Sequence, residues 1–250
     1  MAGHSQFKNI MYRKGAQDAK RAKLFAKLAR EITVAAKSGL QDPKQNPRLR
    51  SAILNARNEN MPNDRIKKAI LKASSNDYSD NYNEIRYEGF GNNGISIIIE
   101  ALTDNKNRTA SEVRSILTKN GGNLGATGSV AFNFKQVGEI SFDINLVNKD
   151  EIIMFAIENQ ATDILEEETT FRIISTTDHF GPLRNSLEQK FGEPKTSKLV
   201  WVAINFIEIN KEEAKKIFYI IDTLEENDDV QNVYTNINIS EKTLSELADD

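Results

Sequence analysis

The hydrophobic periodicity of the chain changes near residue 75, and this change limits the chain to two different kinds of structure. Between Gly15 and about Lys72, apolar residues recur at helical spacing, and alanine, leucine, lysine and arginine dominate. The next segment, SSNDYSDNYN (74–83), is polar and typical of a linker. After it, strand-like alternation is interleaved with helical patterns, as in α/β units. We therefore expect a helical domain followed by α/β structure.

Three helices are predicted in the first part. Their ends are marked by a glycine after the first helix, an asparagine-proline start of the second and a methionine-proline break before the third. They are expected to run roughly from Ala16 to Lys37, from Asn46-Pro47 to about Asn58, and from beyond Met61-Pro62 to near Ala73. Gly39 is expected to take the left-handed conformation that ends the first helix.

The second part is predicted to alternate strands and helices. The predicted strands are GISIIIEALT, SVAFNFK, EISFDIN, TTFRIIST, KLVWVAINFIEI and VQNVYTNINI. Capping patterns predict helix starts at Thr109-x-x-Glu112, Asn148-x-x-Glu151 and Asn210-x-x-Glu213, and Leu183, Leu187 and Phe191 indicate one more helix, stopped by Gly192. These elements suffice for two split βαββαβ sandwiches, which lie either in series or one inside the other.

The net charge of −3 conceals a strong division along the chain. Residues 1–75 hold 17 Lys and Arg against 5 Asp and Glu, a net charge of +12, whereas the remainder holds 16 against 31, a net charge of −15. A basic module joined to an acidic one points to a polyanionic partner, although a charge pattern that only confers solubility is the alternative.

The first helix concentrates its positive charge on one side. On a helical wheel, Lys20, Lys23, Lys27, Arg30 and Lys37 fall within an arc of roughly 100°, and we call these five residues the cationic ribbon. The opposite side carries Leu24, Phe25, Leu28, Ile32 and Ala35. Arg21 falls among the apolar positions, so its side chain must reach solvent or find a partner.

A solvated face usually mixes both signs of charge, whereas almost no acid interrupts the ribbon, and this favours phosphate binding. A membrane-surface helix is disfavoured, because Phe25 is the only aromatic residue of a helix whose apolar side is diluted by alanine. An organelle presequence is disfavoured, because two further capped helices of similar composition follow. The predicted nucleic-acid-binding residues are Lys8, Arg13, Lys14, Lys20, Arg21, Lys23, Lys27, Arg30, Lys37, Arg48 and Arg50. Such contacts position a protein on phosphates without reading sequence.

The sequence offers little for catalysis, so we expect no enzyme, no catalytic residue, no metal site and no cofactor. There is no cysteine, and the two histidines, His4 and His179, lie in different modules, His179 at a predicted helix start. The glycine-rich stretch 121–129 leaves a helix and enters a strand, the opposite of a phosphate loop. The longest apolar run, Ile95–Ile99 with its neighbours, is too short to span a membrane, so no membrane partner is expected.

Four separated segments resemble the YebC/PmpR family. They are MAGHSQFKNIMYRKGAQDAKRAKLFAKLAREITVAAKSG, NPRLRSAILNARNENMP, IRYEGFGNNGISIIIEALTDNKNRTASEVRSILTKNGGNLGATGSVAF and LEENDDVQNVYTNI. The resemblance runs from Met1 to about Ile239 in the same order. Two departures are Phe7 in place of a tryptophan and Asn92-Asn93 in place of a Pro-Gly pair, and both concern local loop geometry.

The resemblance implies an α+β multidomain protein, in which a three-helix domain is followed by two ferredoxin-like α/β domains. The third domain is inserted into the second, which gives 1–79 as the basic helical domain, 80–136 plus 204–250 as the discontinuous domain and 137–203 as the acidic insert. Because the match begins at Met1, we expect no targeting segment. We also expect a cytoplasmic location. No catalytic residue of the family carries over.

The resemblance also implies a DNA-binding transcriptional regulator, the usual description of the family. Its mitochondrial relatives are translational activators, and bacterial members are linked to stalled ribosomes, so ribosomal RNA is the competing target. A third hypothesis is a protein-interaction adaptor that uses the acidic domains, with the helical module only positioning it. Charge alone leaves DNA and RNA open, since both are polyanions.

Overall fold

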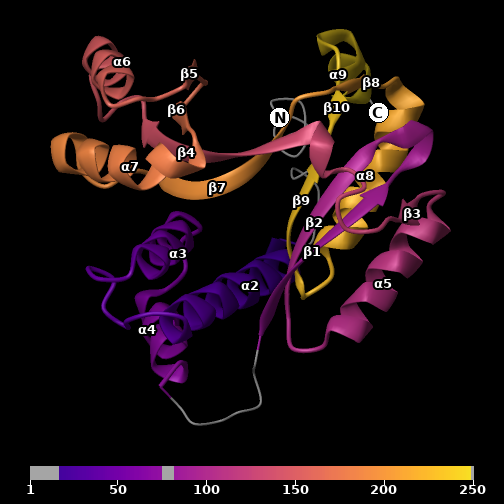
Figure 1. Cartoon of the computed structure of the whole chain (residues 1–250), viewed down its shortest axis with the longest axis horizontal. Coiled ribbons are helices and arrows are strands. Elements are labelled where there is room, and N and C mark those ends of the chain that lie inside the picture. The colour runs from indigo at the N-terminus through magenta and orange to yellow at the C-terminus, as the bar shows by residue number, and fades with distance from the viewer. Residues whose placement is uncertain (1–16, 75–81, 249–250) are drawn as a thin grey trace. The chain divides into compact units, whose positions relative to one another are not determined.

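A computed structural model of the chain describes residues 17–74 and 82–248 (Figure 1). The described residues form two compact units. Unit 1 contains the described parts of 1–27, 77–135 and 202–250, and unit 2 contains those of 28–76 and 136–201, so the first helix passes from one unit to the other after Lys27. The predicted division into three domains stays a prediction.

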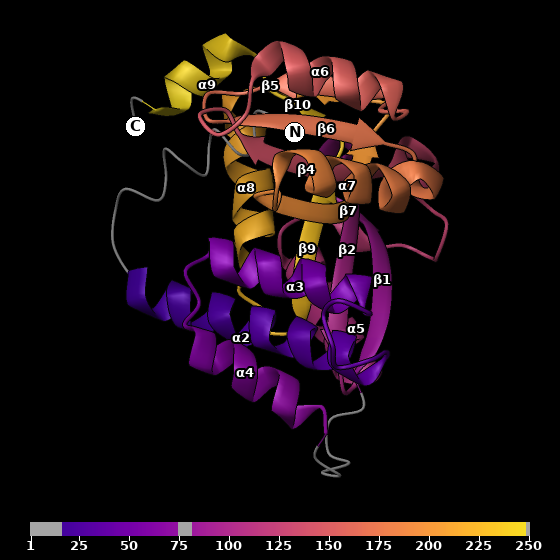
Figure 2. The ribbon, with the colours of Figure 1, turned by 90° about the vertical axis from the view of Figure 1, so that its left-hand side faces the viewer.

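The three helices predicted in the first part are confirmed. They are α2 (Gln17–Lys37), α3 (Pro47–Asn58) and α4 (Asn63–Lys72), visible together in Figure 2. The Thr33 hydroxyl lies 2.9 Å from the carbonyl oxygens of Ala29 and Ala69, which links α2 to α4. The buried apolar residues of these helices in unit 2 are Ile32, Ala35, Ala36, Leu49, Ala52, Ile53, Leu54, Ala56, Ile66 and Ala69. The amphipathic pattern together with the predicted helix ends therefore places these helices correctly.

Asn46 explains how α2 ends and α3 begins. Its Oδ1 accepts the N–H of Leu49 at 3.0 Å, and its Nδ2 donates to the carbonyls of Ala35 and Leu40, each at 2.8 Å. The prediction of a left-handed Gly39 is wrong, because its φ is not in the positive region. A Cβ at position 39 would instead lie 2.7 Å from Asn46 Nδ2. Glycine makes room there for the side chain that joins the two helices.

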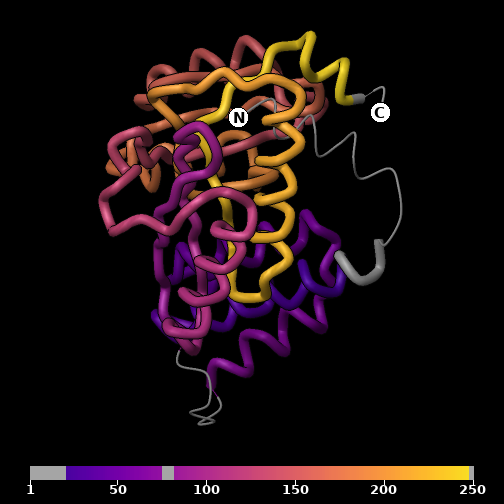
Figure 3. Tube along the Cα trace, turned by 90° about the vertical axis from the view of Figure 1, so that its right-hand side faces the viewer, coloured from indigo at the N-terminus to yellow at the C-terminus, as the bar shows by residue number. Residues whose placement is uncertain are grey.

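The first sheet, in unit 1, has the strand order β3-β1-β2-β9, with each neighbouring pair antiparallel. Its strands are β1 (Asn83–Phe90), β2 (Ser96–Thr103), β3 (Asn123–Leu124) and β9 (Val230–Thr235). The helices α5 (Lys106–Lys119) and α8 (Lys211–Glu225) lie side by side and share one core with β2 (Figure 3). That core contains Ile97, Ile99, Val113, Leu117, Ala214, Ile217, Phe218 and Ile221.

Smaller elements complete unit 1. The two-residue strands β8 (Ile207–Glu208) and β10 (Ile237–Asn238) pair in parallel, α9 (Glu241–Ala248) follows them, and two 3₁₀ turns, η1 (Asn92–Gly94) and η2 (Ala131–Asn133), lie in connections. The capping box predicted at Asn210 and Glu213 is confirmed: Asn210 Oδ1 accepts the N–H of Glu213 at 3.0 Å, and Glu213 Oε2 accepts the N–H of Asn210 at 2.9 Å.

The second sheet, mostly in unit 2, has the ferredoxin-like order β5-β6-β4-β7. Its elements follow each other as β4 (Phe134–Asp143), α6 (Lys149–Glu158), β5 (Asp163–Glu166), β6 (Thr170–Ser175), α7 (Thr177–Phe191) and β7 (Thr196–Ala203), which is the βαββαβ pattern. Both helices pack on Ile140, Phe142, Phe171 and Ile173.

The α+β fold class with a helical region before the sheets is confirmed. So are the caps at Asn148 and Gly192, and His179 lies in the first turn of α7 as expected.

The structure corrects several local predictions. The predicted strand KLVWVAINFIEI is divided into β7 and β8, and the predicted strand VQNVYTNINI is divided into β9 and β10. Helix α5 begins earlier than Thr109, because Asn105 accepts the N–H of Arg108 at 3.1 Å and so acts as its N-cap. Within SVAFNFK, Ala131–Asn133 form η2 rather than a strand and Phe132 is 67% exposed, whereas the last two residues begin β4. Strand β1, which pairs along its whole length with β2, was missed.

Glu88 supplies the physical reason for the η2 turn. Its carboxylate is buried and accepts the N–H groups of Val130 and Ala131 at 2.9 and 3.0 Å, and Arg86 Nη2 lies 3.2 Å from its other oxygen. The backbone N–H groups at the start of η2 are thus bound by a side chain rather than by a neighbouring strand. Burial by itself raises the pKa of Glu88, but these N–H groups, that of Gly128 and the Arg86 charge outweigh it and hold the pKa below its ordinary value.

Glu88→Gln is expected to destabilise the protein by about 1–3 kcal/mol at pH 7, because a buried acceptor of two backbone N–H groups loses its charge. Since the folded pKa is lowered, the stability that Glu88 contributes is present above the unfolded value and is lost as the pH falls through the folded value. Urea denaturation of both proteins from pH 7 to pH 3 would test this. The difference should shrink below about pH 4.5. A constant difference would contradict the assignment.

Candidate nucleic-acid interface

Helix α2 buries most of the side that the wheel predicted to be apolar. Phe25, Ile32 and Ala35 are buried, but Leu24 is 37% exposed and Leu28 is half-buried, so the first part of this side is only partly covered. Along the ribbon, Lys23 and Lys37 are exposed, and Lys27 and Arg30 are half-buried. Arg21 is exposed, with its guanidinium carbon 5.4 Å from the centre of the Phe25 ring, so it has found a cation–π partner.

Some predicted residues cannot be placed. Lys8, Arg13 and Lys14 lie outside the described residues. Lys20 lies in α2, but its side chain is not described. Their predicted contact with phosphates stays a prediction.

Two lysines of the ribbon bind the end of another helix in unit 1. Lys27 Nζ donates to the carbonyl of Glu225 at 2.5 Å, and Lys23 Nζ donates to the carbonyl of Glu226 at 3.2 Å. These carbonyls lie at the C-terminus of α8, where the helix dipole is negative and cations are favoured. In this conformation the two ammonium groups therefore stabilise α8, and phosphate must compete with these carbonyls for them.

The two arginines predicted on α3 have different surroundings. Arg48 forms a bidentate pair with Glu31 of α2, with distances of 2.9 Å from Nε to Oε1 and 3.2 Å from Nη2 to Oε2. In such a pair, the guanidinium N–H groups that could bind a phosphate already donate to a carboxylate. Arg50 is half-buried and has a single long contact among the described hydrogen bonds, from Nη2 to Asn185 Oδ1 at 3.4 Å.

Helix α4 adds cations that the sequence analysis did not select. Arg65, Lys67, Lys68 and Lys72 are exposed, whereas Ile66 and Ala69 are buried. Asp64 is the acidic residue in the first turn of this helix. The same helical-wheel test that identified the ribbon would have found this second basic face, because its apolar residues recur at a spacing of three.

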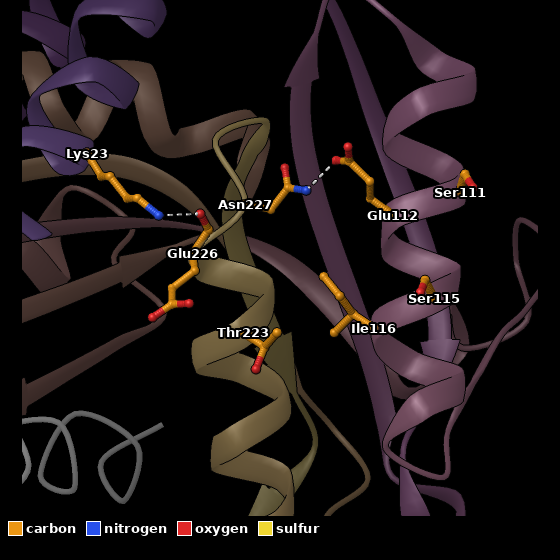
Figure 4. Close-up of a pocket in the computed structure, with 8 residues that line it drawn as sticks. All are labelled: Lys23, Ser111, Glu112, Ser115, Ile116, Thr223, Glu226 and Asn227. Atoms are coloured by element: carbon orange, nitrogen blue, oxygen red, sulfur yellow. Dashed lines mark hydrogen bonds between the residues drawn. The ribbon is translucent and has the colours of Figure 1, made fainter.

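A cavity of about 480 Å³ lies beside Lys23 in unit 1 (Figure 4). Lys23 reaches the backbone of Glu226 at one side, and on the other side the amide of Asn227 donates to Glu112 at 2.6 Å. The remaining lining residues are Ser111, Ser115, Ile116 and Thr223. With one ammonium group and two carboxylates, this cavity lacks the excess of cations that a polyanion needs.

Within residues 17–74 and 82–248, no group of three or more His, Asp or Glu residues is placed to hold a metal ion. Within the same ranges no helix is both long and apolar enough to cross a membrane.

The chain matches two family models and is similar to solved structures. Residues 5–76 match the TACO1/YebC protein N-terminal domain, and residues 82–237 match the TACO1/YebC second and third domain. The chain is also similar to the crystal structure of a conserved hypothetical protein from Aquifex aeolicus, with 39% sequence identity and a TM-score of 0.79. That match covers 92% of this chain and 95% of the Aquifex protein.

Proposed function

Since the chain belongs to the TACO1/YebC family, we propose that it is a nucleic-acid-binding regulator of gene expression, acting as a DNA-binding transcriptional regulator through its basic helical domain. Membership of this family supports a regulatory or translational-activator role in general. The finer assignment to DNA is our inference.

The observation that supports the proposal is the distribution of cations over the helices. Lys23 and Lys37 of α2 and the four cations of α4 are exposed, while the opposite sides of both helices are buried. Exposed lysine and arginine on a module of net charge +12 attract phosphates at long range and release counterions on contact. Neutralising about six phosphates of a DNA duplex would give log K a slope near −5 against log salt.

A ribosome-associated translation factor is the second candidate. The family description names TACO1 beside YebC, and the resemblance links that branch to translational activation. Lysine and arginine grip the phosphates of ribosomal RNA as well as those of DNA. A protein-interaction adaptor that uses the acidic part remains the third hypothesis. The absence of catalytic activity and of a cofactor, and the cytoplasmic location, also stay predictions.

Two measurements on the same protein would separate these candidates. A DNA-binding regulator is expected to bind duplex DNA with a steep salt dependence and to sediment apart from ribosomes in a cell extract. A translation factor is expected to sediment with ribosomal fractions and to leave them when the salt concentration is raised. A salt slope near zero on both DNA and ribosomal RNA would reject nucleic-acid binding and leave the adaptor.

A further inference from the structure

Arg184 is a buried charge in unit 2 with poor partners. It lies in α7, and its side chain is 4% exposed. Its Nη1 is 3.5 Å from the carbonyl of Pro47 in α3, and its Nη2 is 3.6 Å from Glu188 Oε2, so both contacts are long. Its Nε has no hydrogen-bond partner among the described residues. A guanidinium has five N–H donors, and most of those of Arg184 are poorly used.

Arg50 brings a second positive charge to the same place. It lies in α3, and its Nη2 contacts Asn185, the residue that follows Arg184. Its Nε is buried and likewise has no partner among the described residues. Burial lowers the pKa of Arg184, and the charge of Arg50 lowers it further, against the opposing effect of Glu188 and Glu193. The charge of Arg50 thus opposes that of Arg184 where desolvation already disfavours charge.

We propose that Arg50 and Arg184 together bind a phosphate group of the nucleic acid at the contact between α3 and α7. This site rests on the proposed function and extends it, because Arg184 lies in the part of the chain that the sequence predicts to be acidic. The unused N–H groups of two guanidinium forks suit the oxygens of one phosphate. One negative charge between them also removes the repulsion that they suffer without a ligand.

Glu188 shows how an oxyanion reaches this pair. Its carboxylate is already next to Arg184, and its side chain is 28% exposed, so a phosphate that displaces this carboxylate approaches Arg184 from the position that Glu188 leaves. A phosphate that replaces this long contact gains shorter charge-assisted hydrogen bonds.

Arg57 of α3 and Glu193 form another long contact in unit 2, at 3.7 Å, but both of these side chains are more than half exposed. Arg57 therefore serves as a matched control.

The first test uses inorganic phosphate as the probe and the full chain as the protein. At constant ionic strength, phosphate at ten times its dissociation constant is expected to raise the melting temperature by roughly 3 °C relative to chloride. Arg184→Gln and Arg50→Gln should each lose most of this rise, and Arg57→Gln should keep it. Without phosphate, Arg184→Gln should be at least as stable as the unaltered protein. If Arg184→Gln is less stable than the unaltered protein, and phosphate still raises the melting temperature of both Arg184→Gln and Arg50→Gln, then Arg184 is only structural and the site is rejected.

The second test uses nucleic acid and separates this proposal from the general function. Arg184→Gln should weaken binding to duplex DNA or ribosomal RNA about tenfold at all sequences and make the salt slope about 1 less steep. Unchanged affinity and slope, with the unaltered protein still binding, would reject the site but keep the function. A slope near zero for the unaltered protein would reject the function itself. Loss of the phosphate effect with unchanged nucleic-acid binding would show a site for free phosphate and overturn the proposal.

Discussion

Replacing Lys20, Lys23 and Lys27 together by glutamate is expected to reduce the affinity for duplex DNA by at least about a hundredfold and to make the salt slope about 3 less steep. Each lost ammonium group removes one phosphate contact and its released counterion, and each new carboxylate repels the phosphates. Titration of the labelled duplex at several salt concentrations would measure both quantities. Affinity should fall equally for unrelated sequences, since these contacts do not read bases.

A control with the same change of charge tests whether position matters. Lys119, Lys135 and Lys216 are exposed lysines of unit 1 outside the basic module. Changing these three to glutamate alters the net charge by the same amount, yet the affinity should fall by less than about tenfold, because only the general attraction changes. An equal loss in both triple variants would mean that net charge, rather than the ribbon, governs binding.

A second control separates charge from the contact with α8. Lys23 and Lys27 donate to the carbonyls of Glu226 and Glu225, so a change at these positions also affects the end of that helix. In Lys23→Gln/Lys27→Gln the charges are removed without reversal. If stability rather than salt dependence accounts for the lost affinity, the double variant should show lower thermal stability and an unchanged salt slope. If the ribbon binds phosphates, the slope should become about 2 less steep.

The helices were predictable because their signals are local. The Asn210 and Glu213 pair, the Asn148 cap and the glycine that ends α7 lie within a few residues of the backbone groups that they satisfy. Such signals need no knowledge of the rest of the chain. The same holds for the cationic side of α2, which follows from a helical spacing of 3.6 residues.

The errors arise where distant residues decide the local structure. Phe132 lies in a segment that was predicted to be a strand, but the backbone before it is held by Glu88, which lies more than forty positions earlier. Gly39 was assigned a conformational role, whereas its lack of a side chain makes room for Asn46. The carbonyls that receive Lys23 and Lys27 belong to α8, about two hundred residues away. Periodicity carries no information about such pairs.

Asp229 is the residue whose loss is expected to damage unit 1 most. It is 4% exposed, and its Oδ2 accepts hydrogen bonds from Thr103 at 2.9 Å, Arg108 at 2.7 Å and Thr109 at 2.7 Å. Its carbonyl also accepts the N–H of Leu102 at 2.8 Å, so it joins the start of β9 to β2 and α5. Asp229→Ala should cost about 3 kcal/mol, because two buried hydroxyls lose their acceptor.

The exposed Asp104 provides the matched control for this variant. Asp104 Oδ1 likewise lies close to Arg108 Nη2, at 2.8 Å, but the Asp104 side chain is 40% exposed. Asp104→Ala should therefore change the stability little. Urea denaturation followed by far-UV circular dichroism suits the comparison, because the single tryptophan, Trp201, lies in unit 2 and would not report on this sheet. Equal effects of the two variants would show that the exposed ion pair, not the buried hydroxyls, gives the cluster its stability. Asp229 lies four residues after Glu225, the last residue of α8, where Lys23 and Lys27 bind. In Asp229→Ala, the amides near Asn227 should therefore exchange their hydrogens faster. The carbonyls of Glu225 and Glu226 would then be less fixed, so Lys23 and Lys27 become more available to phosphate.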